Sequence, residues 1–148
     1  PAALGGYATL LQSAGRSPGA ADLLYRSALR VNPAQPEVLA NYALLREEAF
    51  QDAEGAEGLY RAALTARPND PITLSHLALL IFDSKQDRMG AKQLMDEALL
   101  LAPNQIPVIC NVADFVFTAF RDVDTAEKLL RRAVRLAPGD VSPLLNLA

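Results

Sequence analysis

Residues 56–64 read AEGLYRAAL and are followed by a proline at position 68. This stretch has apolar residues with the spacing i, i+3, i+4, i+7 and i+8, which forms one apolar stripe of an α-helix. They are Ala56, Leu59, Tyr60, Ala63 and Leu64. The helix is expected to end before Pro68, because the residue that precedes a proline is disfavoured in the helical region. This segment therefore predicts a short helix that buries one face and uses small alanines to do so.

The same pattern recurs along the chain with a period of 35 residues. The proline column consists of Pro33, Pro68, Pro103 and Pro138. Two alanine columns consist of Ala21, Ala56, Ala91 and Ala126, and of Ala28, Ala63, Ala98 and Ala133. A leucine column adds Leu24, Leu59, Leu94 and Leu129. Self-similarity at one fixed period indicates a repeat architecture, in which each unit is one supersecondary element that stacks on the next.

Each period is predicted to contain two helices. The second helix begins after a capping column, since a short side-chain oxygen can accept bonds from first-turn amides; this column is Ser17, Asp52, Asp87 and Asp122. The first helix begins at Gln35-Pro36, Asp70-Pro71, Gln105-Ile106 and Asp140-Val141. Its apolar face in the second repeat consists of Leu39, Tyr42, Ala43 and Leu45. Pairs of opposite charge four residues apart, such as Asp22 with Arg26 and Glu57 with Arg61, predict a solvated outer face on the second helices.

We therefore expect an all-α fold: one right-handed α-solenoid domain over residues 1–148. It would contain four helix–turn–helix repeats, at about 1–35, 36–70, 71–105 and 106–140, and a partial fifth at 141–148. This arrangement predicts eight complete helices, a ninth partial helix and no strand.

Composition and charge narrow the class of protein further. The net charge of the 148 residues is −3 and the pI is about 5.1, which disfavours a nucleic-acid binder. No apolar run reaches the ~18–20 residues that a membrane span needs, so no membrane partner is expected. The one cysteine, Cys110, excludes an internal disulfide. A cytoplasmic location is the default for such a chain, and a lone thiol is also compatible with an extracellular one.

Residues 56–68 contain a small residue at Ala56, then Leu59-Tyr60, Ala63-Leu64 and Pro68, and this order resembles the tetratricopeptide repeat. The resemblance covers essentially the whole chain. The usual period of that family is 34 residues, so we expect the extra residue to lie in the turn before the capping column, between Ala49 and Gln51. A 35-residue period also fits RNA-binding pentatricopeptide repeats. The chain lacks their usual ending of the second helix and the basic groove that phosphate binding requires.

The resemblance implies that the first helices line a concave groove. Mapped by column, the groove candidates are Asn41, His76, Asn111, Asn146, Leu44, Leu79, Phe82, Phe117, Glu47 and Asp83. The asparagine column resembles the ladder with which some family members hold extended peptides, because a carboxamide can both donate to and accept from a peptide bond. Alternatively, these asparagines bond neighbouring repeats or water. The groove columns contain no Lys or Arg, so the expected partner is an apolar or basic protein or peptide.

Catalysis, cofactors and metal sites are not expected. His76 could lie near Cys110 and Asp114 across adjacent repeats, and a Cys–His–Asp set can form a nucleophile. However, His76 occupies an asparagine column and Cys110 a column of small residues, so ordinary substitution explains both. The Cys and His spacing typical of zinc sites is absent from the sequence.

Two functions remain open at this point. The first is a non-enzymatic adaptor whose groove binds a peptide or a helix of a partner protein. The second is structural: a segment of a longer solenoid, or a unit that assembles head to tail. The second is favoured by apolar first-helix residues at both ends of the sequence, namely Leu4, Tyr7, Leu144 and Leu147. An end-to-end contact between unlike surfaces that does not close would propagate as a filament.

If the ends associate, charged substitutions at Leu144 and Leu147 should abolish association and leave the central repeats folded, because damage in a repeat array stays local. Sedimentation of the wild-type chain and the variant at high concentration measures this. A well-folded wild-type monomer at that concentration would contradict the assembly hypothesis.

Overall fold

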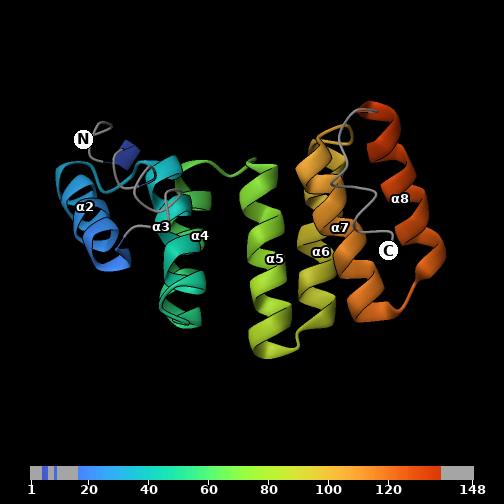
Figure 1. Cartoon of the computed structure of the whole chain (residues 1–148), viewed down its shortest axis with the longest axis horizontal. Helices are drawn as coiled ribbons and strands as arrows, with labels where there is room; N and C mark the ends of the chain where they lie inside the picture. The colour runs from blue at the N-terminus through green and yellow to red at the C-terminus, as the bar shows by residue number, and fades with distance from the viewer. Residues whose placement is uncertain (1–4, 7–8, 10–16, 138–148) are drawn as a thin grey trace. The chain divides into compact units, whose positions relative to one another are not determined.

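The computed structural model describes Gly5, Gly6, Thr9 and residues 17–137, and all regular structure in these ranges is helical (Figure 1). Gly5, Gly6 and Thr9 are helical. Seven complete helices follow: α2 (Pro18–Val31), α3 (Pro36–Glu48), α4 (Ala53–Ala66), α5 (Pro71–Lys85), α6 (Arg88–Leu101), α7 (Ile106–Phe120) and α8 (Val123–Leu136). No strand occurs in this part of the chain, and the expected all-α fold is confirmed. The predicted partial ninth helix and the end-contact candidates Leu4, Tyr7, Leu144 and Leu147 lie outside the described residues.

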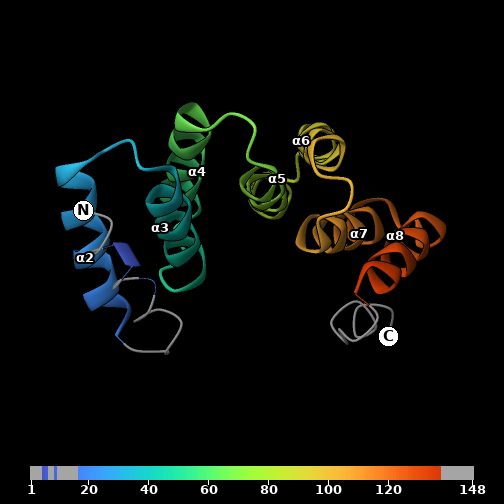
Figure 2. The same ribbon diagram turned by 90° about the horizontal axis from the view of Figure 1, so that it is seen from above.

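The chain forms two compact units, residues 1–68 and 69–148. The boundary falls between the second and third predicted repeats. The first unit contains α2, α3 and α4, and the second contains α5 to α8. Within them, α3 packs on α4, α5 on α6 and α7 on α8, and α7 also contacts α5 and α6 (Figures 1 and 2). Each of the second, third and fourth repeats is therefore a pair of helices joined by a short turn. The prediction of one continuous domain stays a prediction.

The capping column begins the second helices as predicted. The side chain of Ser17 accepts a hydrogen bond from the amide of Ala20 at 3.3 Å. The three aspartates of the column each accept a hydrogen bond from the amide three residues later; the distances are 3.0 Å for Asp52, 2.9 Å for Asp87 and 3.1 Å for Asp122. The first helices α3, α5 and α7 begin after Gln35, Asp70 and Gln105 without such a bond and carry a proline in the first turn instead. Proline suits that position because its missing N–H would have no helical partner.

A non-glycine residue in the left-handed conformation lies directly before each of the capping residues Asp52, Asp87 and Asp122. These residues are Gln51, Gln86 and Arg121, with φ angles of 53°, 55° and 54°. They occupy one column of the repeat, and a left-handed residue reverses the chain at the end of a helix. The turn is closed by backbone bonds from the amide of Asp52 to the carbonyl of Arg46 at 2.9 Å, and from Asp122 to Val116 at 3.2 Å. The turn that we expected to hold the extra residue is therefore a left-handed turn.

The alanine columns lie at the contacts between helices. Ala21, Ala56 and Ala91 have no exposed surface, and Ala126 is 6% exposed. The second column is equally buried, with Ala63 at 2% and Ala98 at 0%. The apolar face predicted for the first helix of repeat two is buried in α3, from Ala43 at 0% to Tyr42 at 7%. Small side chains in the columns let the backbones of paired helices approach, and larger residues fill the space on either side.

The prediction of a solvated outer face is wrong for Asp22, which is only 9% exposed. Tyr42 donates a 2.6 Å hydrogen bond to its carboxylate, and Arg26 and Arg46 pair with it at 2.9 and 3.2 Å. Arg46 continues to the capping residue Asp52 at 2.8 Å. A buried carboxylate needs such partners because it has left water. The i, i+4 charge pair is here part of a network that joins α2, α3 and the start of α4.

Replacing Ala63 with leucine should lower the free energy of unfolding by about 1–3 kcal/mol, because added methylenes at a buried helix contact force strain. Arg61→Ala removes a pair in which the arginine side chain is 56% exposed and that of Glu57 is 15% exposed, so its effect should stay below that of Ala63→Leu. Urea denaturation of the two variants measures the difference. Equal midpoints would show that the alanine column does not form the helix contact.

Candidate functional site

The two asparagines of the expected ladder that the structure describes bond to neighbouring first helices. Asn41 on α3 donates from Nδ2 to the hydroxyl of Thr9 at 3.3 Å, and Asn111 on α7 donates to the hydroxyl of Ser75 on α5 at 3.0 Å. Both asparagines are half-buried. Each therefore uses one donor to connect repeats and keeps its carbonyl oxygen for another group. His76 is half-buried on α5, and Asn146 lies outside the described residues.

The apolar candidates divide into an interior group and a surface group. Phe82 is 7% exposed and packs edge-on against Phe115, with ring centres 5.6 Å apart. It belongs to the core of the second unit, which corrects its placement among the groove residues. Phe117 is 43% exposed, and the guanidinium of Arg121 lies 5.5 Å from its ring centre. Leu44 and Leu79 are half-buried.

The acidic candidates have different environments. In the first unit, Glu47 on α3 accepts a 3.0 Å hydrogen bond from the hydroxyl of Tyr60 on α4. Burial, and then the charge of Glu47, raise the pKa of Tyr60, so its phenol remains a donor. In the second unit, partial burial and then the negative charge of Asp114 raise the pKa of Asp83. Asp83 still exposes more than a third of its surface, so water screens part of this effect.

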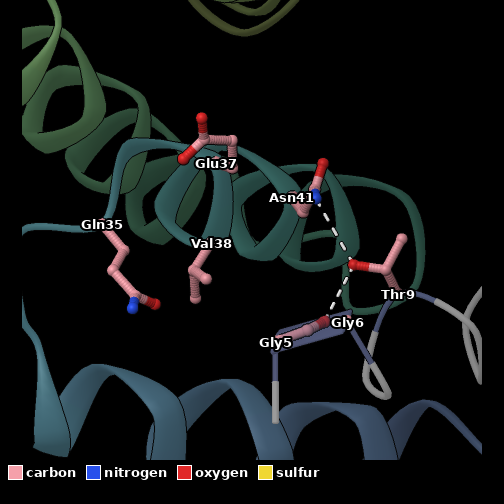
Figure 3. Close-up of a pocket in the computed structure, with 7 residues that line it drawn as sticks. All are labelled: Gly5, Gly6, Thr9, Gln35, Glu37, Val38 and Asn41. Atoms are coloured by element: carbon pink, nitrogen blue, oxygen red, sulfur yellow. Dashed lines mark hydrogen bonds between the residues drawn. The ribbon is translucent and has the colours of Figure 1, made fainter. Parts of the chain in front are cut away.

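An open pocket of about 350 Å³ lies in the first unit, between the described residues of the first helix and the start of α3 (Figure 3). Its lining consists of Gly5, Gly6, Thr9, Gln35, Glu37, Val38 and Asn41. Gly6 occupies the column that holds Asn41, His76 and Asn111 in the other repeats. A Cβ added at Gly6 would meet nothing within 4 Å, whereas one at Gly5 would come within 2.6 Å of Val38. Gly5 therefore permits close helix approach, and Gly6 leaves the space open.

The polar groups of this pocket are linked on one side. Thr9 donates to the carbonyl of Gly5 at 3.0 Å and accepts from Asn41 (Figure 3). Its hydroxyl also lies 3.1 Å from that of Tyr25. On the other side, the amide oxygen of Gln35 is buried and accepts no hydrogen bond from any residue that the structure describes. Glu37 lies at the rim and pairs with Arg67 at 2.6 Å. Sequence reasoning missed Gln35 and Glu37, because their columns flank the expected groove and carry no distinctive motif.

The three nucleophile candidates lie on two helices of the second unit, with His76 on α5 and Cys110 and Asp114 on α7. Cys110 is half-buried on α7 and Asp114 is exposed on the same helix. Within the same ranges, no group of three or more His, Cys, Asp or Glu side chains is arranged to hold a metal ion. None of the described helices has the length and apolar character that crossing a membrane requires.

Comparison with solved structures identifies the fold. The chain superposes on a structure of Pseudomonas aeruginosa PilF with a TM-score of 0.82 and 20% identity, covering 98% of this chain and 64% of that one. A tetratricopeptide repeat protein from Parabacteroides merdae matches with a TM-score of 0.77 and 23% identity, covering 99% and 56%. One from Thermus thermophilus matches with a TM-score of 0.78 and 20% identity, covering 95% and 76%. The chain thus spans less than two thirds of the first two proteins.

No protein-family model and no curated protein sequence matches the chain. The structural similarity to tetratricopeptide repeat proteins nevertheless extends over nearly all of its length. The tetratricopeptide fold that the sequence predicted is therefore confirmed. At this level of identity the similarity defines the fold, and the site must be argued from the residues of this chain.

Asp83→Asn should stabilise the second unit at pH 7. The raised pKa means that the folded state favours the protonated carboxyl, so ionisation above that pKa destabilises the wild type. The gain should stay within about 1 kcal/mol, because the group is partly exposed. This gain should shrink toward zero as the pH falls below 3.8, the ordinary pKa of an aspartate, because Asp83 is then protonated in both the folded and the unfolded state.

Denaturant melts of wild type and variant at pH 7 and pH 3.5 measure this difference. A gain that is unchanged or larger at the lower pH would contradict the assigned charge environment of Asp83.

Proposed function

We propose that this chain is a non-enzymatic protein-interaction scaffold whose first-helix faces bind an apolar or basic segment of a partner protein. The observation that carries the proposal is the carboxylate pair of Asp83 on α5 and Asp114 on α7. Neither carboxylate has a hydrogen bond or ion pair with any described residue, and the charge of Asp114 acts on Asp83. A cation of a partner would relieve this repulsion and gain two favourable charge contacts.

The surroundings of the pair supply the apolar half of the proposed interface. Phe117 lies one turn after Asp114 on α7 and exposes 43% of its surface. Its ring also contacts the guanidinium of Arg121, and the exposed part of the ring offers apolar surface to a partner. The partner segment would place an apolar side chain near Phe117 and a basic one near Asp83.

The fold agrees with this class of function without specifying a partner. Helical repeats of this type present long side-chain arrays at regular spacing, which favours recognition of extended or helical segments. The proteins with the matching fold include tetratricopeptide repeat proteins of bacteria and the APC/C hetero-tetramer Cut9–Hcn1. The similarity to that complex covers 97% of this chain at 15% identity.

Panning of a displayed random-peptide library against the immobilised chain tests the proposal. Enriched peptides should combine apolar residues with Lys or Arg and should lack runs of Asp or Glu. A synthetic enriched peptide should bind the double variant Asp83→Asn, Asp114→Asn about threefold to tenfold more weakly, as expected for loss of two partly exposed charge contacts. Isothermal titration calorimetry at ~0.15 M salt measures the affinities.

The matched control is Glu97→Gln combined with Asp124→Asn, which removes the same charge from exposed positions on α6 and α8 of the same unit. It should leave the affinity unchanged. Acidic enriched peptides, or equal loss in both double variants, would overturn the proposed surface.

A further inference from the structure

The pocket beside Gly6 owes its open space to a missing side chain. The column of Gly6 holds Asn or His in the next three repeats, so the first repeat alone among these lacks a side chain there. An added Cβ at Gly6 meets no atom within 4 Å, so the position is open. The volume of about 350 Å³ lies at the small end of the range of ~300–1,000 Å³ for ligand pockets. A side chain of a partner fits within this volume.

The hydrogen-bonding groups that remain available in the pocket are mainly acceptors. The hydroxyl hydrogen of Thr9 goes to the carbonyl of Gly5, so Thr9 can only accept from Asn41. Asn41 must therefore present its NH₂ to Thr9, which leaves its carbonyl oxygen as an acceptor. The amide oxygen of Gln35 is buried and has no donor among the described residues. In Figure 3 this oxygen lies on the side of the Gln35 amide that faces Val38.

The described lining of the pocket carries one negative charge, on Glu37, which also pairs with Arg67 outside the lining. The hydrogen bond from Arg67 keeps the pKa of Glu37 below its ordinary value, so this carboxylate at the rim is ionised at neutral pH. No Lys or Arg belongs to the described pocket lining. Gln35, Glu37 and Asn41 thus each contribute an acceptor to the described pocket lining, which also contains the apolar side chain of Val38.

We propose that this pocket binds the ammonium group of a lysine side chain from a partner segment. The ammonium has three donors and no acceptor, which matches the acceptors that Gln35, Glu37 and Asn41 contribute to the pocket lining. The methylene stem of the lysine would lie along Val38, as such stems do on apolar surfaces. The inference rests on the proposed function, since it names the side chain that one partner segment would insert into the first unit.

The test uses Nα-acetyl-lysine N-methylamide as the probe and the norleucine analogue, which has the same stem length and no ammonium, as the comparison. Titration into the ¹⁵N-labelled full chain should shift the amide signals of Gly5 and Gly6 and the side-chain amide of Gln35. A saturable response in the millimolar range is expected for a single side chain. The norleucine probe, and a probe with acetylated lysine nitrogen, should leave these signals in place.

Gly6→Asn should abolish the response, because it restores the side chain that the next repeat carries at this column. Gly58→Asn is the matched control: Gly58 is also a helical glycine with nothing within 4 Å of an added Cβ, and it lies on α4 away from the pocket lining. This variant should bind as wild type does. Circular dichroism establishes that both variants fold.

Gln35→Leu is the second variant, and it separates binding from folding. It should also abolish the response, and its denaturation midpoint should be equal to or higher than that of the wild type, since a buried acceptor without a partner is removed. Equal shifts with the lysine and norleucine probes, wild-type binding by Gly6→Asn, or tighter binding of the arginine analogue would overturn the lysine assignment.

Failure here is distinguishable from failure of the proposed function. If panned peptides bind through Asp83 and Asp114 while the lysine probe gives no response, only the pocket inference is wrong. If the lysine probe binds and panning yields no peptide, the pocket stands as an amine site and the scaffold proposal is wrong.

Discussion

The close approach of paired helices at alanine is the constraint on which the rest of this structure depends. Packed helix axes lie about 8–10 Å apart, and small side chains at the crossing allow the shorter distances. Ala56 and Ala63 meet this condition on α4, and Ala91 and Ala98 meet it on α6, with almost no exposed surface. Larger residues such as Tyr60 and Met95 then fill the space beside each contact. The 35-residue period persists because each repeat needs the same small residues at the same turn of the helix.

The turns between paired helices keep the alanine contacts aligned, and they do so at a cost in backbone conformational energy. A non-glycine residue in the left-handed region is unfavourable by about 1 kcal/mol or more, and Gln51, Gln86 and Arg121 all adopt it. The following aspartate then caps the next helix, and its own amide closes the turn where Asp52 bonds to Arg46 and Asp122 to Val116. One short segment thus ends one helix and begins the next, which keeps the two helices of a repeat in contact.

The residues that differ between repeats form the buried charge network and the candidate binding features, whereas the residues that recur in every repeat form the helix contacts. In the first unit, Tyr42 and Arg46 surround the buried carboxylate of Asp22. The same columns of the second unit contain Leu77 and Ile81, both of which are buried. The candidate binding features are likewise departures from the repeat: Gly6 lacks a side chain, and Asp83 stands where the second repeat has Glu48. A repeat of this kind can change one face without disturbing the helix contacts, because the two sets of residues lie on different sides of the helix.

By itself, the sequence determined the helix pairs, their capping residues and the buried columns. These follow from periodicity, which reports the face of a helix that must avoid water, and from caps, which depend only on neighbouring residues. The tertiary structure alone decided that Phe82 is interior and that Asp22 is buried. It also decided that the buried amide oxygen of Gln35 has no hydrogen-bond donor among the described residues. The left-handed conformation of the turn residues was also not predicted from the sequence, because none of them is a glycine. The physical reason is that periodicity describes one helix at a time, whereas burial and hydrogen-bond partners depend on which side chains the neighbouring helices bring.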